Sequence, residues 1–451
     1  MNDLQKVYFI GIGGIGMSAL ARYYNGRKIN VFGYDKTETT LTKKLVTEGI
    51  TIHYEDDTTQ IPSGIDLVIY TPAIPENHRV LNYFRKSGFP VKKRAEVLGM
   101  ISRERRTIAI AGTHGKTTTT SILTHLLKTG GVDCTAFLGG IANNFVSNFV
   151  EGKGEWVVVE ADEYDRSFLQ LAPEMAVILS MDADHLDIYG ADDQVKAGFQ
   201  AFGQQVKKNG QLIVNQKWET EYLKNNKDQR TVKTYGLTTG DYHATNVRVI
   251  EGFFVFDFNS KNQHIASLQF TLPGHHNVEN ATAAIAVALE LGVSLDAIRR
   301  ALVSFKGIRR RFDIIYRDEK RVYIDDYAHH PSELRAAIHA ARTLFPNRTI
   351  TGVFQPHLFS RTRDFLTEFA AVLSTLDEVI LLEIYPAREL PIPGITAQTI
   401  FDRLTNDNKT LADKATLIDI LTKKNPEILM TLGAGDIDTL VEPIKALLNN
   451  G

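Results

Sequence analysis

The sequence predicts a multidomain α/β protein built from parallel sheets. Short β-branched runs alternate with helical stretches over most of the 451 residues, which is typical of parallel strands joined by crossover helices. Two glycine-rich loops follow strand-like runs, "FIGIGGIGM" at 9–17 and "AIAGTHGKTTTT" at 109–120. A strand that runs into such a loop and then a helix is a common way for a backbone to bind phosphate. The length suggests about three domains of roughly 150 residues each.

The first two domains differ in their strand patterns. Within 1–105, "VYFIG", "INVFGYD" and "DLVIYTPAI" form a βαβαβ pattern, and the basic segment "KKRAEVLGMISRERR" contains the first boundary. Within 106–311, the runs "TIAIAG", "EWVVVEAD", "MAVILSMDAD" and "GQLIVN" predict strands around helices. Then "HATNVRVIEGFFVFDF" and "HIASLQF" alternate like antiparallel strands with a turn at "NSKNQ", and a helix ends at Gly292.

The third domain is predicted over 312–451. The α/β alternation restarts there with "VYIDDY", "TITGVFQ", "EVILLEI" and "EILMTLG", which indicates a second parallel sheet of the Rossmann type. The fold class is therefore α/β, with parallel sheets at both ends flanking a central phosphate-loop domain that contains an antiparallel section.

Composition excludes several classes of protein. The 51 basic and 53 acidic residues give a formal net charge of −2, which does not support nucleic-acid or membrane-surface binding. A single cysteine, Cys134, fits a reducing compartment. The start "MNDLQKVYFIG" lacks the pattern of a signal peptide, and we find no run of 18 apolar residues. We expect a cytoplasmic protein.

The first glycine loop, "GIGGIG", matches the dinucleotide-binding pattern after a strand, with an acidic residue 19 positions past its last glycine. The pattern predicts a diphosphate site but does not identify the rest of the ligand. The alternative is a tight strand–helix turn without a ligand. The residues of this predicted site are Gly11, Gly13, Gly14, Ile15, Gly16 and Asp35.

The second loop, "GTHGKT", resembles a P-loop, although Ile110 occupies the place of the first glycine in the standard spacing. Backbone N–H groups can still bind phosphate, Lys116 can reach the β and γ oxygens, and the Thr117 hydroxyl can bind Mg²⁺. The alternative is a threonine-rich helix start. The predicted ATP-binding residues of this loop are Gly112, Thr113, His114, Gly115, Lys116, Thr117 and Thr118.

Acidic residues gather where two later strands end. Glu160 is followed by Asp162, Glu163 and Asp165, and the next strand ends in Asp182, Asp184, His185 and Asp187. Carboxyl ends of parallel strands carry the sites of α/β folds, so the two clusters indicate a metal site. Taken alone, each of these residues would more often be a solvated loop charge.

Further along the chain, Asn277 and Asn280 lie three residues apart on one helical face, suited to a purine edge or a ribose. Helix capping is the competing explanation for Asn277. Arg311 in "RRRFD" is a candidate phosphate partner, or else part of an exposed basic stretch between domains.

In this order, "GTHGKTTTT", "EADE", "ADHLDIYG", "GHHNVENATAA", "RRRFD", "DDYAHHPSE", "QPH", "SRTRD" and "PIPG" resemble the Mur ligase family over nearly the whole chain. The resemblance implies a UDP-sugar domain, an ATPase domain and a C-terminal domain that closes over the nucleotide. It implies ATP-dependent addition of L-alanine to the lactyl carboxylate of UDP-N-acetylmuramate through an acyl phosphate, in bacterial peptidoglycan synthesis. Mg²⁺ is the implied metal, with Mn²⁺ as an alternative, and NAD is not expected.

The resemblance also implies roles for residues. Thr117, Glu160 and His185 would hold the metal, and Lys116, Glu160, His185, Arg311 and Asp326 would be catalytic. Asn277, Asn280, Arg311 and Asp326 would contact ATP, whereas the muramoyl and alanine end would be bound by Tyr327, His329, Arg361 and Arg363.

Three positions depart from the family pattern. Leu358 stands where an arginine follows "QPH", which leaves selectivity for L-alanine over glycine or serine open. Tyr164 replaces an expected serine, as in the related ligase that recycles murein tripeptide. Gln200 occupies the place of the carbamylated lysine of other branches, so no such lysine is predicted.

Two other classes of protein compete with a ligase. An NAD-dependent oxidoreductase would use the first loop but leaves "GTHGKT" and the acidic clusters unexplained. A P-loop switch protein would use the second loop but has no need of a first diphosphate site. A ligase uses both.

Overall fold

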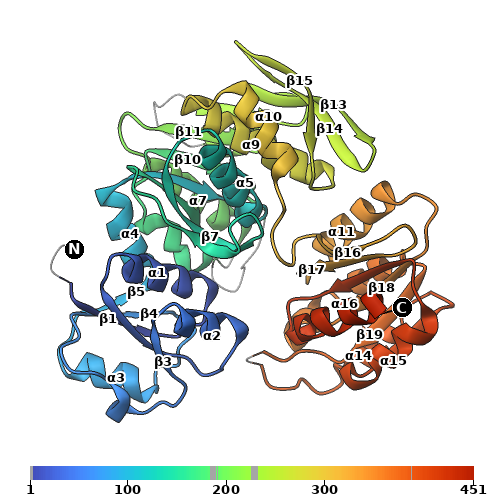
Figure 1. Cartoon of the computed structure of the whole chain (residues 1–451), viewed down its shortest axis with the longest axis horizontal. Helices are drawn as coiled ribbons and strands as arrows, with labels where there is room; N and C mark the ends of the chain where they lie inside the picture. Colours follow the sequence, from blue (N-terminus) through green and yellow to red (C-terminus); the bar gives the residue numbers. More distant parts are fainter. Residues whose placement is uncertain (1–3, 183–188, 190, 225–231, 388, 451) are drawn as a thin grey trace. The chain divides into compact units, whose positions relative to one another are not determined.

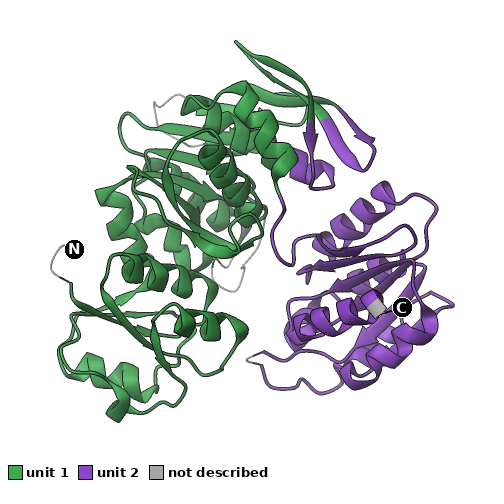
Figure 2. Ribbon diagram, in the orientation of Figure 1, with its two compact units in different colours: residues 1–246, 256–268, 279–305 green, residues 247–255, 269–278, 306–451 purple. Residues whose placement is uncertain are grey.

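The structure is a computed structural model that describes residues 4–182, 189, 191–224, 232–387 and 389–450. The described chain contains three sheets (Figure 1). Two compact units can be distinguished: unit 1 comprises residues 1–246, 256–268 and 279–305, and unit 2 comprises residues 247–255, 269–278 and 306–451 (Figure 2). We describe each unit by itself.

The N-terminal sheet of unit 1 has five parallel strands in the order β3-β2-β1-β4-β5. The run "VYFI" of β1 is fully buried, because both faces of a parallel sheet are covered by crossover helices. The strands are β1 (Lys6–Ile10), β2 (Asn30–Tyr34), β3 (Thr51–His53), β4 (Leu67–Tyr70) and β5 (Val91–Lys93), and the helices are α1 (Ile15–Gly26), α2 (Thr40–Thr47), α3 (Arg79–Lys86) and α4 (Arg94–Glu104).

The central sheet has ten strands in the order β15-β14-β13-β12-β11-β10-β6-β9-β7-β8. Its middle, from β12 to β7, is parallel, and β8 pairs antiparallel to β7. The strands are β6 (Arg106–Ala111), β7 (Cys134–Ala142), β8 (Ser147–Val150), β9 (Trp156–Ala161), β10 (Met175–Ile178), β11 (Gln211–Asn215), β12 (Val232–Gly236), β13 (Tyr242–Ile250), β14 (Phe253–Ser260) and β15 (His264–Phe270).

Helices and 3-10 elements connect the strands of this sheet, and η3 (Gln216–Trp218) follows β11 directly. The others are α5 (Lys116–Thr129), the 3-10 element η2 (Tyr164–Gln170), α7 (Asp192–Gln204), α8 (Glu219–Leu223), α9 (His275–Glu290) and α10 (Leu295–Ser304). Gln200 of α7 donates its side-chain amide to the carbonyls of Glu221, Tyr222 and Lys224, at the C-terminal end of α8. Its observed role is therefore to cap that helix.

The predicted antiparallel section contains one turn more than the sequence indicates. The single run "HATNVRVIEGFFVFDF" forms two strands, β13 and β14, separated by Glu251 and Gly252. Both residues have positive φ, 51° and 82°, which fits a tight two-residue hairpin turn. The dipeptide Glu-Gly is a weaker turn signal than Asn-Gly or Asp-Gly, so the strand alternation concealed it.

Unit 2 contains the C-terminal sheet, with the order β16-β17-β21-β18-β19-β20 and only β16 antiparallel among its described strands. The strands are β16 (Asp313–Arg317), β17 (Val322–Asp326), β18 (Ile350–Phe354), β19 (Glu378–Leu382), β20 (Lys409–Ala412) and β21 (Ile428–Leu432), and the helices are α11 (Pro331–Leu344), α12 (Phe359–Asp364), α13 (Leu366–Leu373), α14 (Ala397–Phe401), α15 (Lys414–Lys424) and α16 (Val441–Asn450). The predicted α/β class is confirmed.

Within unit 1, helix α1 joins the N-terminal sheet to the central one. It packs against β7 and β8, and the buried Asn148 of β8 donates to Ser18 Oγ at 2.9 Å and to the Ile15 carbonyl. Arg22 in turn donates to Asn148 and, through Nε, to Glu48 at 2.7 Å. This buried polar junction fixes the start of α1, and with it the first glycine loop, against the central sheet.

Among the described residues, the structure contains no helix both long and apolar enough to cross a bilayer.

Candidate active site

The first glycine loop is closed by its own backbone and by Asp35. The N–H groups of Gly11 and Ile12 donate to the Tyr34 carbonyl at 2.8 and 3.0 Å. Gly13 N–H donates to Asp35 Oδ2 at 2.7 Å, and Thr37 N–H donates to Oδ1 at 3.2 Å. Gly11 has φ +84°, which favours glycine. Asp35 therefore shapes the loop, and α1 begins directly after it.

The second loop is supported by Ser180, which lies just after β10. Ser180 Oγ lies 2.8 Å from Thr113 Oγ1 and accepts the His114 N–H at 3.0 Å. Gly115 precedes α5 with φ +83°, and a Cβ at that position would lie 2.5 Å from Asn280 Oδ1. The structure therefore brings Asn280 against the loop at Gly115.

Glu160 is oriented by two neighbours. The Thr117 hydroxyl donates to its Oε2 at 3.0 Å, and the Gly139 N–H donates to its Oε1. Strand β9 pairs with β6, placing Glu160 opposite Ile110 at the carboxyl edge of the sheet. A hydroxyl and a carboxylate side by side are hard oxygen donors of the kind that Mg²⁺ prefers, so these two residues fit the predicted metal.

The other predicted metal ligand, His185, lies outside the described residues, as do Asp184 and Asp187. Within the ranges that the structure describes, no group of three histidine, cysteine or acidic side chains could hold a metal ion.

The remaining acidic residues of the "EADEYD" segment each contact a cation. Asp162 pairs with Arg94 at 3.3 Å, Glu163 with Lys116 at 2.7 Å and Asp165 with Lys93 at 3.0 Å. Both Lys93 and Arg94 lie at the start of α4. Asp162, Glu163 and Asp165 are therefore engaged in ion pairs. Among the described residues of this segment, Glu160 is the acidic one that contacts the Thr117 hydroxyl.

A cavity of about 350 Å³ connects the two loops. Its lining includes Gly14 and Gly16 from the first loop, Lys116 from the second, and Glu160 from β9. Arg94 and Asp162 also line it. A ligand in this cavity would therefore touch both a diphosphate-type loop and a P-loop lysine.

Arg94 was not among the residues predicted from the sequence. Its guanidinium lies against Gly16, where a Cβ would be 3.0 Å from Nη1, and contacts Asp162 across the cavity lining. The basic segment that contains it was predicted only to hold the first domain boundary. Only the contact between Arg94 and Gly16 shows that this arginine faces the first glycine loop.

We expect Arg94→Ala to raise the KM for the anionic sugar substrate, because a guanidinium contact to a charged group contributes about 1.5–3 kcal/mol, or on the order of tenfold to a hundredfold. Steady-state kinetics with varied UDP-sugar, the substrate that the family resemblance implies, would measure it. Lys93→Ala is the matched control: this neighbouring cation pairs with Asp165, and both side chains are 43% exposed. Equal effects of the two variants would contradict a role for Arg94.

Gly139 is a second residue that the sequence did not single out. A Cβ at this position would overlap the Glu160 carboxylate. We expect Gly139→Ala to displace Glu160 and to lower kcat by on the order of a hundredfold, the effect of a misplacement of about 1 Å. Measured kcat, melting temperature and UDP-sugar affinity would separate this effect from unfolding. A kcat loss with a matching loss of stability or sugar affinity would contradict it.

In unit 2, Asp326 binds the backbone of two segments. Its Oδ2 accepts the Phe312 N–H at 2.7 Å, and Oδ1 accepts the Ala328 N–H at 2.7 Å. Burial raises the pKa of its carboxyl to about 6. Arg311, next to Phe312, lies with its guanidinium 5.4 Å from the centre of the Tyr327 ring. The structure thus shows Asp326 fixing the turn that carries Arg311.

Tyr327 and His329 lie together, with ring centres 5.2 Å apart. His329 Nδ1 is 2.9 Å from the Tyr327 carbonyl oxygen and 3.3 Å from Glu333 Oε2, and burial lowers the pKa of its imidazole. Arg361 lies near enough to His329 to contribute to that lowering. Arg363, in contrast, is half-exposed and paired with Asp364 at 2.7 Å.

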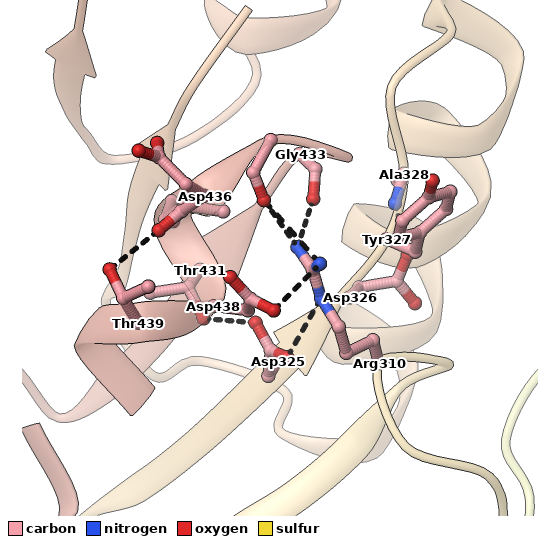
Figure 3. A network of polar contacts seen from close by, with 12 residues as sticks. Arg310, Asp325, Asp326, Tyr327, Ala328, Thr431, Gly433, Asp436, Asp438 and Thr439 are labelled. Atoms are coloured by element: carbon pink, nitrogen blue, oxygen red, sulfur yellow. Dashed lines mark hydrogen bonds and ion pairs between the residues drawn. The ribbon is translucent and has the colours of Figure 1, made fainter. Parts of the chain in front are cut away.

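The neighbouring Arg310 forms a network that the sequence did not predict (Figure 3). Its guanidinium donates to the Gly433 carbonyl and lies 3.5 Å from Asp325 Oδ2 and 3.6 Å from Asp438 Oδ2. Asp325 also accepts the Thr431 hydroxyl at 2.6 Å. Arg310 therefore anchors the "RRRFD" segment to β17 and to the loop after β21.

Two further predicted positions have local explanations. The Asn277 side chain donates to the Pro273 carbonyl at 2.7 Å, within the first turn of α9. Leu358 has φ +71°, and its N–H donates to the Tyr385 carbonyl at 3.0 Å. Neither contact tests a role in ligand binding.

Three family models match this chain: "Mur ligase family, catalytic domain" over residues 6–106, "Mur ligase middle domain" over 110–288, and "Mur ligase, glutamate ligase domain" over 310–435. The chain belongs to the Mur ligase family.

Within that family, the chain is similar to curated relatives named UDP-N-acetylmuramate–L-alanine ligase. The one from Flavobacterium johnsoniae is 49% identical, and the match covers 100% of this chain and 99% of that protein. The one from Christiangramia forsetii is 47% identical, and the match covers 99% of this chain and 98% of that protein. The solved UDP-N-acetylmuramate-alanine ligase MurC of Thermotoga maritima superposes with a TM-score of 0.84 at 29% identity, covering 99% of this chain and 100% of that one.

Proposed function

We propose that this protein is an ATP-dependent ligase that adds L-alanine to the lactyl carboxylate of UDP-N-acetylmuramate in the cytoplasm. The cavity that joins the two loops carries the proposal, because a ligase must bring a sugar-nucleotide and the γ-phosphate of ATP to one place. The full-length similarity to UDP-N-acetylmuramate–L-alanine ligases supports this choice of substrates.

A free carboxylate is a poor acyl donor because its leaving group would be oxide, so the lactyl carboxylate must first be activated. Phosphoryl transfer from ATP to the lactyl carboxylate forms a P–O bond to it and releases ADP. The alanine amine then attacks the acyl carbon, the C–N bond forms, and inorganic phosphate leaves with the C–O bond electrons as the amine loses a proton. The protein contributes positioning and charge neutralisation to these steps.

In this proposal the first loop, with Gly11, Gly13, Gly14, Ile15, Gly16 and Asp35, binds the sugar diphosphate, and residues 112–118 bind ATP. Arg94 is added to the sugar side of the cavity. Thr117 and Glu160, with His185, would hold Mg²⁺ or Mn²⁺, which supplies charge neutralisation at the phosphates. Lys116 would hold the transferring phosphate and stabilise charge on its oxygens.

Residues of α9 and of the chain from Arg311 onward are assigned by resemblance and by their local structure. Arg311, on the turn fixed by Asp326, would contact ATP together with Asn277 and Asn280. Tyr327, His329, Arg361 and Arg363 would face the muramoyl and alanine end. Because Arg363 is half-exposed and paired with Asp364, we expect it to contribute less than Arg361.

An oxidoreductase is the alternative that the first loop alone would allow. Thermal-shift measurements with the UDP-sugar, ATP and NAD distinguish the two, because a bound ligand raises the melting temperature according to its concentration over its Kd. We expect stabilisation by UDP-N-acetylmuramate and by ATP with Mg²⁺. Stabilisation by NAD in place of the UDP-sugar would contradict the ligase.

A further inference from the structure

The P-loop lysine is held by a buried carboxylate. Lys116 Nζ donates to Glu163 Oε2 at 2.7 Å and to Oε1 at 3.0 Å. It also donates to the Gly112 carbonyl at 2.6 Å, at the other end of the glycine loop. The Glu163 side chain is 1% exposed and that of Lys116 is 17% exposed. The pair is therefore nearly withdrawn from water, although Lys116 also lines the cavity.

Glu163 sits on a turn that is fixed on several sides. Its carbonyl accepts the Tyr189 hydroxyl at 2.8 Å and the Arg166 N–H at 2.9 Å. The preceding Asp162 accepts the Tyr164 N–H at 3.1 Å and pairs with Arg94. A carboxylate on such a turn can define the position of a flexible lysine side chain.

The three contacts of Lys116 match the three donors of an ammonium group. For the lysine to donate to a phosphate oxygen, at least one of these contacts must be given up. The Gly112 carbonyl belongs to the phosphate-binding loop itself, whereas Glu163 lies outside the loop, on the segment after β9. Giving up the contact to Gly112 would free one donor for a phosphate in the loop while both contacts to Glu163 remain.

We propose that Glu163 is a positioning residue for Lys116. Its carboxylate holds the ammonium at the glycine loop before ATP binds, and keeps a hydrogen bond to it while the phosphates take another donor. The sequence grouped Glu163 with candidate metal ligands, but its carboxylate is directed to the lysine. The inference rests on the proposed function, in which this loop binds ATP.

Glu163→Gln in the full chain tests the inference, because glutamine keeps the shape and removes the charge. We expect kcat to fall by about tenfold or more, with the KM for UDP-N-acetylmuramate changed by less than about twofold, since the sugar loop is untouched. Glu163→Asp keeps the charge with a shorter reach, and should recover part of the lost kcat. If Glu163 had a purely structural role, Glu163→Gln would lower the melting temperature, and kcat would not fall selectively while the KM for UDP-N-acetylmuramate stayed the same.

A double-variant cycle identifies the partner. If Glu163 acts through Lys116, adding Glu163→Gln to Lys116→Ala should slow turnover by less than about twofold beyond Lys116→Ala alone. Asp165→Asn is the control on the same turn, since Asp165 pairs with the half-exposed Lys93. If the unmodified chain makes the amide, two results would overturn the inference: near-native kcat in Glu163→Gln, or a double variant in which the effects of the two single variants on kcat multiply. An unmodified chain without ligase activity would overturn the proposed function, and the inference with it.

Discussion

Lys116→Ala is expected to lower kcat/KM for ATP by on the order of 10²–10³-fold, because it removes a charged donor to the transferring phosphate. Affinity for UDP-N-acetylmuramate should persist, since the diphosphate loop belongs to β1 and α1. Steady-state kinetics with ATP varied, together with calorimetric titration of the UDP-sugar, would measure both quantities.

The matched control is Lys128→Ala in the last turn of the same helix, where Lys128 pairs with Asp133 at 2.5 Å. That variant should keep near-native kinetics. Because Lys116→Ala also leaves the buried Glu163 carboxylate without its cation, its melting temperature must be measured alongside. Simultaneous loss of UDP-sugar and ATP binding in a folded Lys116→Ala variant would contradict the division of labour between the loops.

Glu160→Ala is expected to abolish measurable turnover, with little recovery at high Mg²⁺. The carboxylate accepts the Thr117 hydroxyl at 3.0 Å, and in the proposed function these two residues would hold the metal, so the loss of Glu160 would remove both a charge and a ligand. Glu160→Gln keeps the size of the side chain and one carbonyl oxygen that can accept the Gly139 N–H, puts an NH2 group beside the Thr117 hydroxyl, and removes the charge. It should lose on the order of 10²–10³-fold in kcat, the effect of removing one electrostatic contact to the transition state.

Metal titrations of activity with Mg²⁺ and with Mn²⁺ would measure the effect of each Glu160 variant. A Glu160→Gln variant with native rate and native metal dependence would show that the residue is only a strand-end group. His185→Ala is predicted to change the preference between the two metals, since a neutral imidazole suits Mn²⁺ better than Mg²⁺.

The sequence predicted the sheets well because their signals are local. Buried β-branched runs such as "VYFI" and the glycine loops after β1 and β6 mark strand, loop and helix without reference to the rest of the chain. The hairpin turn at Glu251 and Gly252 was not predicted because Glu-Gly is a weaker turn signal than Asn-Gly or Asp-Gly. Local patterns alone did not separate the two strands.

The site was predicted in part. Thr117 and Glu160 were each assigned to the metal, by the loop motif and by the family resemblance, but the contact between them was not predicted. The contacts of Arg94 with Asp162 and of Gly139 with Glu160 join residues 68 and 21 positions apart, and they depend on packing between elements. The sequence also did not indicate which partner each acidic residue of "EADEYD" contacts. Charge and spacing are the same whether a carboxylate faces a metal or a lysine, and only the fold distinguishes Glu160 from Glu163.

The central claim is that both loops serve one reaction, and phosphate release measures it most directly. Inorganic phosphate should be followed with ATP and Mg²⁺ alone, with UDP-N-acetylmuramate or L-alanine added singly, and with both. We predict sustained release only with both, in a 1:1 ratio to the amide product, since one phosphate leaves for each C–N bond formed. Brisk release from ATP without either substrate, or oxidation of NADH by the same protein, would contradict the account.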